Sequence, residues 1–201
     1  NETAHSGRVG QVKEITSLTN PMVKDIRALA QKKYRDQQNA FMAEGVKLII
    51  DAFELGWTIR TLIFAKSQRG NATVEKLAAR TVAAGATVLE VNEKVLGAIT
   101  RRDNPQMVLG VFEQRWARLR DIRPASGDLW LALDRVRDPG NLGTIIRTAD
   151  AVGARGVMLV GETTDPFSLE TVRATMGSIF AMPVVRATQD DFLSWSQASA
   201  T

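Results

Sequence analysis

Hydrophobic and polar positions follow two periods along the first half of the chain, and the two periods alternate. Short apolar runs typical of buried strands cover residues 40–45, 58–65, 87–91 and 106–113. Apolar positions at helical spacing cover residues 46–56, 71–85 and 92–100. Strands that alternate with helices through short turns predict a three-layer α/β domain, which we expect to end near Glu113.

An amphipathic helix is predicted before the first of these strands, over residues 20–35. Asn20 is suited to cap it, and Pro21 to occupy its first position. Its apolar face consists of Val23, Ile26, Leu29 and Ala30. Its basic side, for solvent or a partner, consists of Lys24, Arg27, Lys32 and Arg35. Residues 1–14 are polar and are expected to form a disordered tail, so the first domain is placed at residues 15–113.

The regular pattern lapses at residues 114–127, which are charged and include a proline and a Ser-Gly pair. We interpret this segment as an interdomain linker. A second α/β unit is predicted over residues 128–201. Its predicted strands cover residues 129–136, 155–161 and 181–185, and its second predicted helix covers residues 168–180.

The link between the first two of these strands is the most informative part of the chain. Asp138-Pro139-Gly140 is a strong turn signal, and Asn141 is suited to cap the helix that follows. The apolar positions of that helix are Ile145, Ile146, Ala149 and Val152. Gly153 is expected to end the helix, which makes 155–161 the returning parallel strand. In such a βαβ unit, the loop at the carboxyl end of the first strand is the usual place for a site.

Two familiar nucleotide-binding motifs do not fit this turn. Its glycines, Gly140 and Gly143, have G-x-x-G spacing, which is neither the dinucleotide fingerprint nor a phosphate loop ending in GK[ST]. A nucleotide-binding oxidoreductase therefore ranks last among the alternatives. Arg147, away from the apolar stripe, either belongs to a solvated helix face or reaches back toward the turn, and spacing alone favours the first interpretation.

Composition narrows the chemistry further. The chain has 26 Lys and Arg against 22 Asp and Glu, a net charge of +4 and a pI near 9.7, which suits a polyanionic partner and an ordinary basic surface equally. It contains no cysteine and one histidine, His5 in the polar tail, so thiol chemistry is excluded and a histidine metal site is not expected. Without a signal-peptide core or an apolar run of membrane length, we expect a cytoplasmic protein.

The segments LDRVRDPGNLGTIIRTADAVGARGVMLVG and SLETVRATMGSIFAMPVV resemble the catalytic domain of the SpoU (TrmH-like) family of RNA 2′-O-ribose methyltransferases, in the SPOUT superfamily. The upstream SLTNPMVKDIRALAQKKYR and FMAEGVKLIIDA resemble the L30e-like substrate-binding domain of such enzymes. The resemblance covers nearly the whole chain after its tail. It implies an L30e-like domain followed by the first part of a Rossmann-like, trefoil-knot catalytic domain.

The resemblance also implies an activity and site residues. The activity is methylation of an RNA ribose with S-adenosyl-L-methionine and no metal, on ribosomal RNA rather than transfer RNA, by a homodimer. Asn141 and Arg147 are the implied active-site pair, and Arg173 is an implied RNA contact. Family proposals make the arginine a general base, whereas a guanidinium with a pKa above 12 is better suited to hold a phosphate and the developing alkoxide.

The family's Gly-x-Glu turn and Ser-Leu-Asn helix, which complete the knot and cradle the cofactor, are not found in this sequence. We therefore expect cofactor-binding residues after Thr201 and expect the chain to be a shortened form of the enzyme. Cofactor binding and dimerisation are then not expected of this chain alone, and the alternative function is RNA binding without catalysis.

Basic residues on the first domain are the remaining candidates for RNA contact. They lie on the first helix and in the TRRDNPQ loop: Lys24, Arg27, Lys32, Lys33, Arg35, Arg101 and Arg102. Tyr34 and the four tryptophans are able to stack on bases, but we interpret the tryptophans as packing residues.

Overall fold

The computed structural model describes residues 10–199 and divides the chain into two compact units, Asn1–Glu113 and Gln114–Thr201. His5 and most of the predicted polar tail lie outside the described residues. Among those that are described, no helix is both long and apolar enough to cross a membrane. The two units are described separately.

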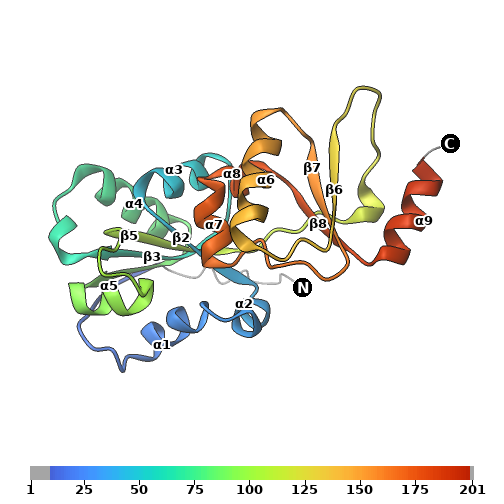
Figure 1. The fold of residues 1–201 in the computed structure, drawn as a ribbon. Coiled ribbons are helices and arrows are strands. Elements are labelled where there is room, and N and C mark those ends of the chain that lie inside the picture. The colour runs from blue at the N-terminus through green and yellow to red at the C-terminus, as the bar shows by residue number, and fades with distance from the viewer. Residues whose placement is uncertain (1–9, 200–201) are drawn as a thin grey trace, which may run out of the picture. The chain divides into compact units, whose positions relative to one another are not determined.

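The first unit is a mixed five-stranded sheet with helices on both faces (Figure 1). The strands are β1 Gln11–Ile15, β2 Ala40–Glu44, β3 Ile59–Ala65, β4 Thr87–Val91 and β5 Val108–Glu113. The helices are α1 Pro21–Ala28, α2 Lys32–Gln38, α3 Val46–Glu54, the 3-10 turn η1 Lys66–Gln68, α4 Ala72–Ala83 and α5 Glu93–Thr100. The strand order is β1-β4-β3-β5-β2, in which β1, β4 and β3 are parallel and β5 is antiparallel to both of its neighbours.

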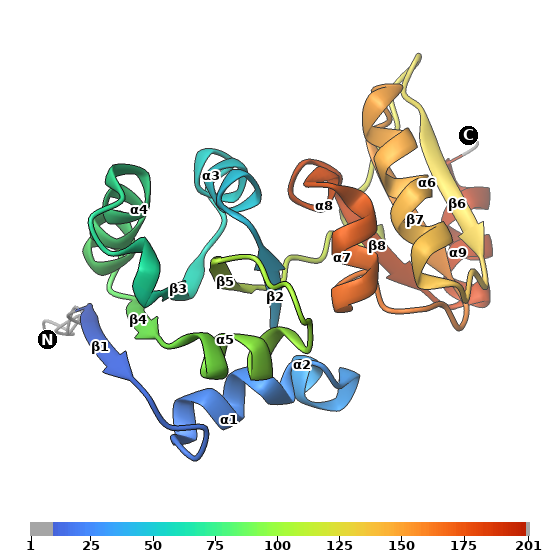
Figure 2. The ribbon, with the colours of Figure 1, turned by 60° about the vertical axis from the view of Figure 1, so that its left-hand side comes forward.

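The helices and the sheet form the three layers that the sequence predicts. Helices α3 and α4 lie on one side of the sheet and α1 and α5 on the other, as Figure 2 shows. Phe41 on β2 and Phe112 on β5 are register partners and are fully buried, and Trp57 contacts Phe41 edge-on with ring centroids 5.8 Å apart. Trp57 is therefore a packing residue, as predicted.

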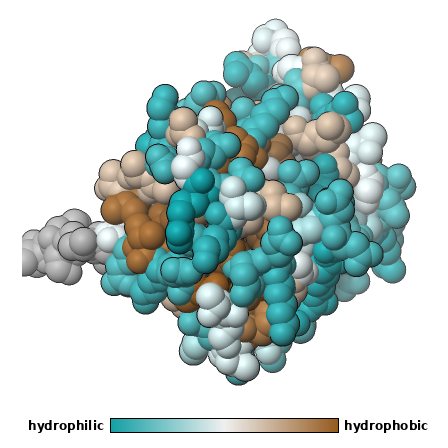
Figure 3. Space-filling view, turned by 90° about the vertical axis from the view of Figure 1, so that its left-hand side faces the viewer, coloured by the Kyte–Doolittle hydropathy of each residue, from teal (hydrophilic) through white to brown (hydrophobic). Residues whose placement is uncertain are grey.

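On the face seen in Figure 3, hydrophobic residues occur in small groups among hydrophilic ones.

Two predictions for the start of this unit are wrong. Residues 11–14 are not part of a tail, because Gln11–Ile15 pairs in parallel with β4 as an edge strand. The helix predicted at residues 20–35 is interrupted by Gln31, whose backbone is extended, so that α2 begins only at Lys32. The cap is as predicted, because the Asn20 side chain accepts a hydrogen bond from the Met22 amide at 2.9 Å.

The second unit is a three-stranded parallel sheet with order β6-β7-β8. The strands are β6 Trp130–Asp134, β7 Gly156–Val160 and β8 Val184–Ala187. The helices are the 3-10 turn η2 Leu119–Asp121, α6 Pro139–Ala151, α7 Leu169–Thr175, α8 Ser178–Ala181 and α9 Gln189–Ser199. The single helix predicted at 168–180 is two helices, because Met176 and Gly177 both adopt positive φ.

The segment predicted as a linker packs on this second unit. The Ala117 amide donates to the Val184 carbonyl at 2.9 Å, and Ile122 is buried in a cluster with Met158 and Val185. The indole of Trp195 on α9 donates to the Ile122 carbonyl at 3.3 Å. Residues 114–122 therefore pack as part of the second unit.

Candidate active site and RNA-binding surface

The loop between β6 and α6 is shaped by Asp138 rather than by Asn141. Asp138 is the N-cap of α6, and its carboxylate accepts a hydrogen bond from the Asn141 amide at 2.7 Å. Pro139 takes the first helical position, where a missing amide costs nothing, so the helix begins before Asn141. The predicted cap at Asn141 is therefore wrong, and its side chain is exposed in the first turn of α6. The predicted end is correct, because Gly153 follows the helix with φ of +74°.

Arg147 is exposed on α6, nearly two turns after Gly140. At 3.6 residues per turn, seven residues make nearly two complete turns, so Arg147 shares a face with Gly140, whereas Asn141 is displaced by about a third of a turn. Helical side chains lean toward the amino end of their helix, so we expect the guanidinium to extend toward the turn that contains Gly143 and Thr144.

Helix α7 packs against that same turn. A Cβ atom on Gly143 would lie 2.4 Å from the Ala174 Cβ and 2.7 Å from the Thr171 carbonyl oxygen, so only glycine allows the two helices to approach this closely. Arg173, the other residue implied for this unit, lies on α7 and is half-buried. The contact at Gly143 therefore holds the helix of Arg147 against the helix of Arg173.

The carboxyl ends of β6 and β7 add a charged pair that the sequence analysis did not identify. Arg135 follows β6 with φ of +53°, and its side chain donates twice to Asp134, with Nε–Oδ1 2.9 Å and Nη2–Oδ2 3.0 Å. These hydrogen bonds lower the pKa of Asp134 and raise that of Arg135. The Arg135 amide donates to the Val160 carbonyl, and a Cβ on Gly161 would lie 3.0 Å from the Arg135 side chain. The Asp-Arg step after an apolar run was the available signal.

The basic residues of the first helical segment do not share one environment. Lys24, Lys32 and Lys33 are exposed, and Lys32 forms an ion pair with Asp36 at 2.6 Å. Arg27 is half-buried. Arg35 is only 4% exposed and donates to the Leu29 carbonyl at 3.0 Å, so its predicted surface position is wrong.

The loop after α5 presents a second basic group. Arg101 ends the helix with φ of +54° and is exposed. Arg102 lies 3.5 Å from the buried carboxylate of Glu44 at the end of β2, which fixes the loop next to the start of α3. Both arginines therefore lie on the surface.

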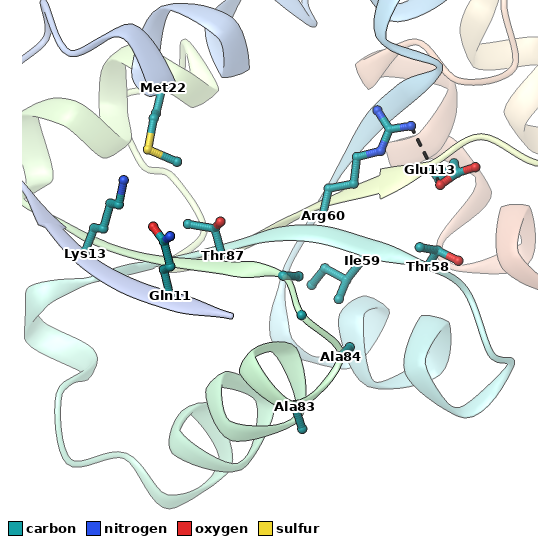
Figure 4. A pocket seen from close by; sticks show the side chains of 12 residues that line it. Gln11, Lys13, Met22, Thr58, Ile59, Arg60, Ala83, Ala84, Thr87 and Glu113 are labelled. Atoms are coloured by element: carbon teal, nitrogen blue, oxygen red, sulfur yellow. Dashed lines mark ion pairs between the residues drawn. The ribbon is translucent and has the colours of Figure 1, made fainter. Parts of the chain in front are cut away.

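A hollow of about 920 Å³ lies at the amino ends of β1, β3 and β4 (Figure 4). Arg60 and Glu113 form an ion pair at one side of it, 3.7 Å apart, and Gln11 and Lys13 line another side. Sites in open α/β sheets lie at carboxyl ends of strands, so we assign this hollow no role. The residues that the structure describes also contain no group of three or more His, Cys, Asp or Glu side chains able to hold a metal ion.

Two family models match the chain, one on each unit. The MRM3-like substrate binding domain matches residues 20–110, and the SpoU rRNA Methylase family matches residues 128–200.

Relatives of known activity and structure agree with these matches. The 23S rRNA (guanosine(2553)-2'-O)-methyltransferase RlmP of Bacillus subtilis is 34% identical over 175 residues, which are 87% of this chain and 65% of that protein. The chain thus spans slightly less than two thirds of that relative. The crystal structure of an rRNA methyltransferase from Sinorhizobium meliloti is 67% identical with a TM-score of 0.90, covering 94% of this chain and 71% of that one. Its AdoMet-bound form is 68% identical with a TM-score of 0.88, covering 94% and 69%.

Proposed function

The chain belongs to the SpoU family of rRNA methylases, and we propose that it serves in the transfer of a methyl group from S-adenosyl-L-methionine to a ribose 2′-hydroxyl of ribosomal RNA. The observation that carries this proposal is the placement of exposed Asn141 and Arg147 on α6, directly after the carboxyl end of β6. The likeness to an AdoMet-bound rRNA methyltransferase supports the choice of methyl donor.

Arg147 is proposed to stabilise charge rather than to remove the proton. A ribose hydroxyl is a poor nucleophile, so the site must orient it and stabilise the alkoxide that develops on its oxygen. A guanidinium offers five N–H donors and stays protonated, which suits an alkoxide and the phosphate beside it but not a base. Its exposure on α6 leaves it accessible to an RNA strand.

Asn141 is proposed to position the ribose. Its backbone amide is held by Asp138, which fixes the first turn of α6, while its side-chain amide faces solvent and has both a donor and an acceptor. A residue in this role orients the hydroxyl without changing its charge.

The methyl donor supplies an electrophilic methyl group on a sulfonium when it is bound. Asp134 and Arg135, the charged residues at the carboxyl end of β6, pair with each other and are each about two-thirds exposed. We therefore assign it no residue of this chain, and the proposed roles concern the RNA side of the reaction.

Exposed basic residues of the first unit are proposed to hold the RNA. They are Lys24, Lys32, Lys33, Arg101 and Arg102. Arg27 and, on the second unit, Arg173 are half-buried and are proposed to contact RNA with the exposed part of their side chains. Arg35 is buried and is not proposed as an RNA contact. The preference for ribosomal over transfer RNA, action as a homodimer and a cytoplasmic location are proposed on the family resemblance alone.

The test is methyl transfer by the full-length protein from tritiated S-adenosyl-L-methionine to ribosomal RNA. A 2′-O-methyl group blocks alkaline cleavage at its nucleotide, so the product is expected as an alkali-resistant labelled dinucleotide. Thr148→Ala, an exposed change beside Arg147 on the same helix, is the matched control for Arg147→Ala. RNA binding without any transfer would instead support the non-catalytic alternative.

A further inference from the structure

A second hollow, of about 560 Å³, lies wholly within the second unit. It is bordered by η2 and the segment before it, the end of β8 and helix α9, none of which carries Asn141 or Arg147. The residues that matter for its chemistry are Trp116, Arg118, Arg120, Arg186, Asp191 and Trp195. Its volume is within the range of roughly 300–1,000 Å³ that holds small ligands.

The wall near β8 is a stack of two planar groups. The Arg186 guanidinium lies 4.2 Å from the centroid of the Trp116 ring. Trp116 is in turn fixed by fully buried Phe167, which it meets edge-on at 5.1 Å between centroids. Arg186 is exposed, so its planar group is held in place and accessible. Unpaired RNA bases stack on aromatic rings and on guanidinium planes.

A second tryptophan of fixed orientation, Trp195, also lines this hollow. Trp195 donates from its indole to the Ile122 carbonyl at 3.3 Å, and its ring lies 6.1 Å from that of Phe192. Trp195 and Arg120 also line a neighbouring hollow of about 490 Å³ that includes Arg123. The two hollows therefore continue along the same surface.

The charge of this surface favours a polyanion. The lining of the 560 Å³ hollow includes Arg118, Arg120 and Arg186 against Asp191 alone, and the adjoining 490 Å³ hollow adds Arg123. The Arg123 guanidinium donates to the Arg120 carbonyl at 2.7 Å, and this hydrogen bond holds the Arg123 side chain next to Arg120. Positive charge with interleaved aromatic rings is the pattern of surfaces that bind single-stranded nucleic acid.

We propose that this surface binds an unpaired segment of RNA, with a base on the Trp116–Arg186 stack and the adjoining phosphates on Arg118 and Arg120. The proposal rests on the proposed function only in taking RNA as the partner. In a double helix the bases stack on one another, and an acidic peptide has no base. Neither partner would therefore place a planar group on Trp116 and Arg186.

The probe is a fluorescein-labelled ten-nucleotide unpaired RNA, with the same sequence as a duplex for comparison, titrated with the chain while anisotropy and tryptophan emission are followed. Arg186→Lys keeps the charge but removes the planar group. We expect it to weaken binding of the unpaired RNA roughly tenfold without changing the dependence on salt. Binding of the unpaired RNA is also expected to quench tryptophan emission.

The charge contribution is tested by Arg118→Gln combined with Arg120→Gln. Loss of two phosphate contacts on a single strand should flatten the slope of log affinity against log salt by about 1.4. Lys76→Gln combined with Arg80→Gln removes the same charge from exposed positions on α4 of the other unit, and is expected to leave the slope unchanged. Unaltered circular dichroism spectra check that each variant is folded.

Three results would overturn the proposal: wild-type affinity in Arg186→Lys, an unaltered salt slope in the Arg118 and Arg120 variant, or equal binding of the duplex with equal sensitivity to Arg186→Lys. No methyl donor is present in this assay. Methyl transfer by Arg147→Ala therefore tests only the proposed role of Arg147. Wild-type binding in Arg186→Lys would overturn the proposed RNA-binding surface without bearing on the proposed methyl transfer.

Discussion

The contact at Gly143 leads to a quantitative prediction for Gly143→Ala. The added Cβ would lie 2.4 Å from the Ala174 Cβ, whereas carbon atoms in good contact are about 3.5–4.0 Å apart. Helices α6 and α7 would therefore have to separate by about 1 Å. The Thr171 carbonyl oxygen at 2.7 Å is backbone and cannot rotate away, so the strain falls on the helix pair.

Two opposing free energies set the size of the effect. Overpacking of a core costs about 1–3 kcal/mol, and here we expect the upper part of that range because a backbone atom is involved. Replacing glycine by alanine inside a helix returns up to about 1 kcal/mol. The free energy of unfolding should therefore fall by about 1–2 kcal/mol.

Gly140→Ala, in the first turn of the same helix, is the matched control. The nearest atom to its added Cβ is the Asp138 carboxylate oxygen at 3.4 Å, and Gly140 is exposed. This variant should be neutral or more stable by up to about 1 kcal/mol.

Urea unfolding followed by tryptophan emission measures both variants, because Trp116, Trp130 and Trp195 all lie in the second unit. With a slope near 2 kcal/mol per molar urea, Gly143→Ala should lower the midpoint by about 0.5–1 M. Unfolding midpoints that are equal for the Gly140 and Gly143 variants would refute the claim that this glycine sets the spacing of α6 and α7.

Three further predictions concern other parts of the chain. Asp138→Ala removes the cap of α6 and should cost about 1 kcal/mol in the same unfolding assay; an unchanged midpoint would show that the cap contributes nothing. Arg101→Gln with Arg102→Gln should weaken RNA binding and flatten its salt slope, and an unaltered slope would return both residues to an ordinary surface. Hydrogen bonds from the Ala125 amide and from Arg155 lower the pKa of Asp128, so its stabilisation is complete above the ordinary value of 3.8 and is lost as pH falls through the folded pKa. The stability difference between wild type and Asp128→Asn should thus be present near neutral pH and shrink as the pH falls below 3.8; a difference that stays constant as the pH falls below this value would contradict this assignment.

Periodicity was sufficient to locate nearly all strands and helices, because most of them bury one face or both. Strand β1 was missed because it is an edge strand whose first four residues are exposed, so its sequence reads as polar. The break at Gln31 and the burial of Arg35 were also missed. The Arg35 guanidinium donates to the Leu29 carbonyl across this break, a contact that helical spacing does not encode.

The candidate site was only partly predictable for a similar reason. The turn and the exposure of Arg147 follow from residue types and spacing, but the cap moved from Asn141 to Asp138 because Pro139 fixes the first helical position. The Trp116–Arg186 stack joins residues seventy positions apart. Only the fold brings such residues together, so sequence pattern assigned Trp116 to packing alone.

The most direct test of the central claim is methyl transfer to ribosomal RNA by the full-length protein with Arg147 replaced by alanine. The account predicts that labelled, alkali-resistant product is lost in Arg147→Ala, is retained in Thr148→Ala, and that RNA affinity changes by no more than a few-fold in either. Wild-type turnover in Arg147→Ala would contradict it, because the exposed guanidinium on α6 would then have no part in the reaction.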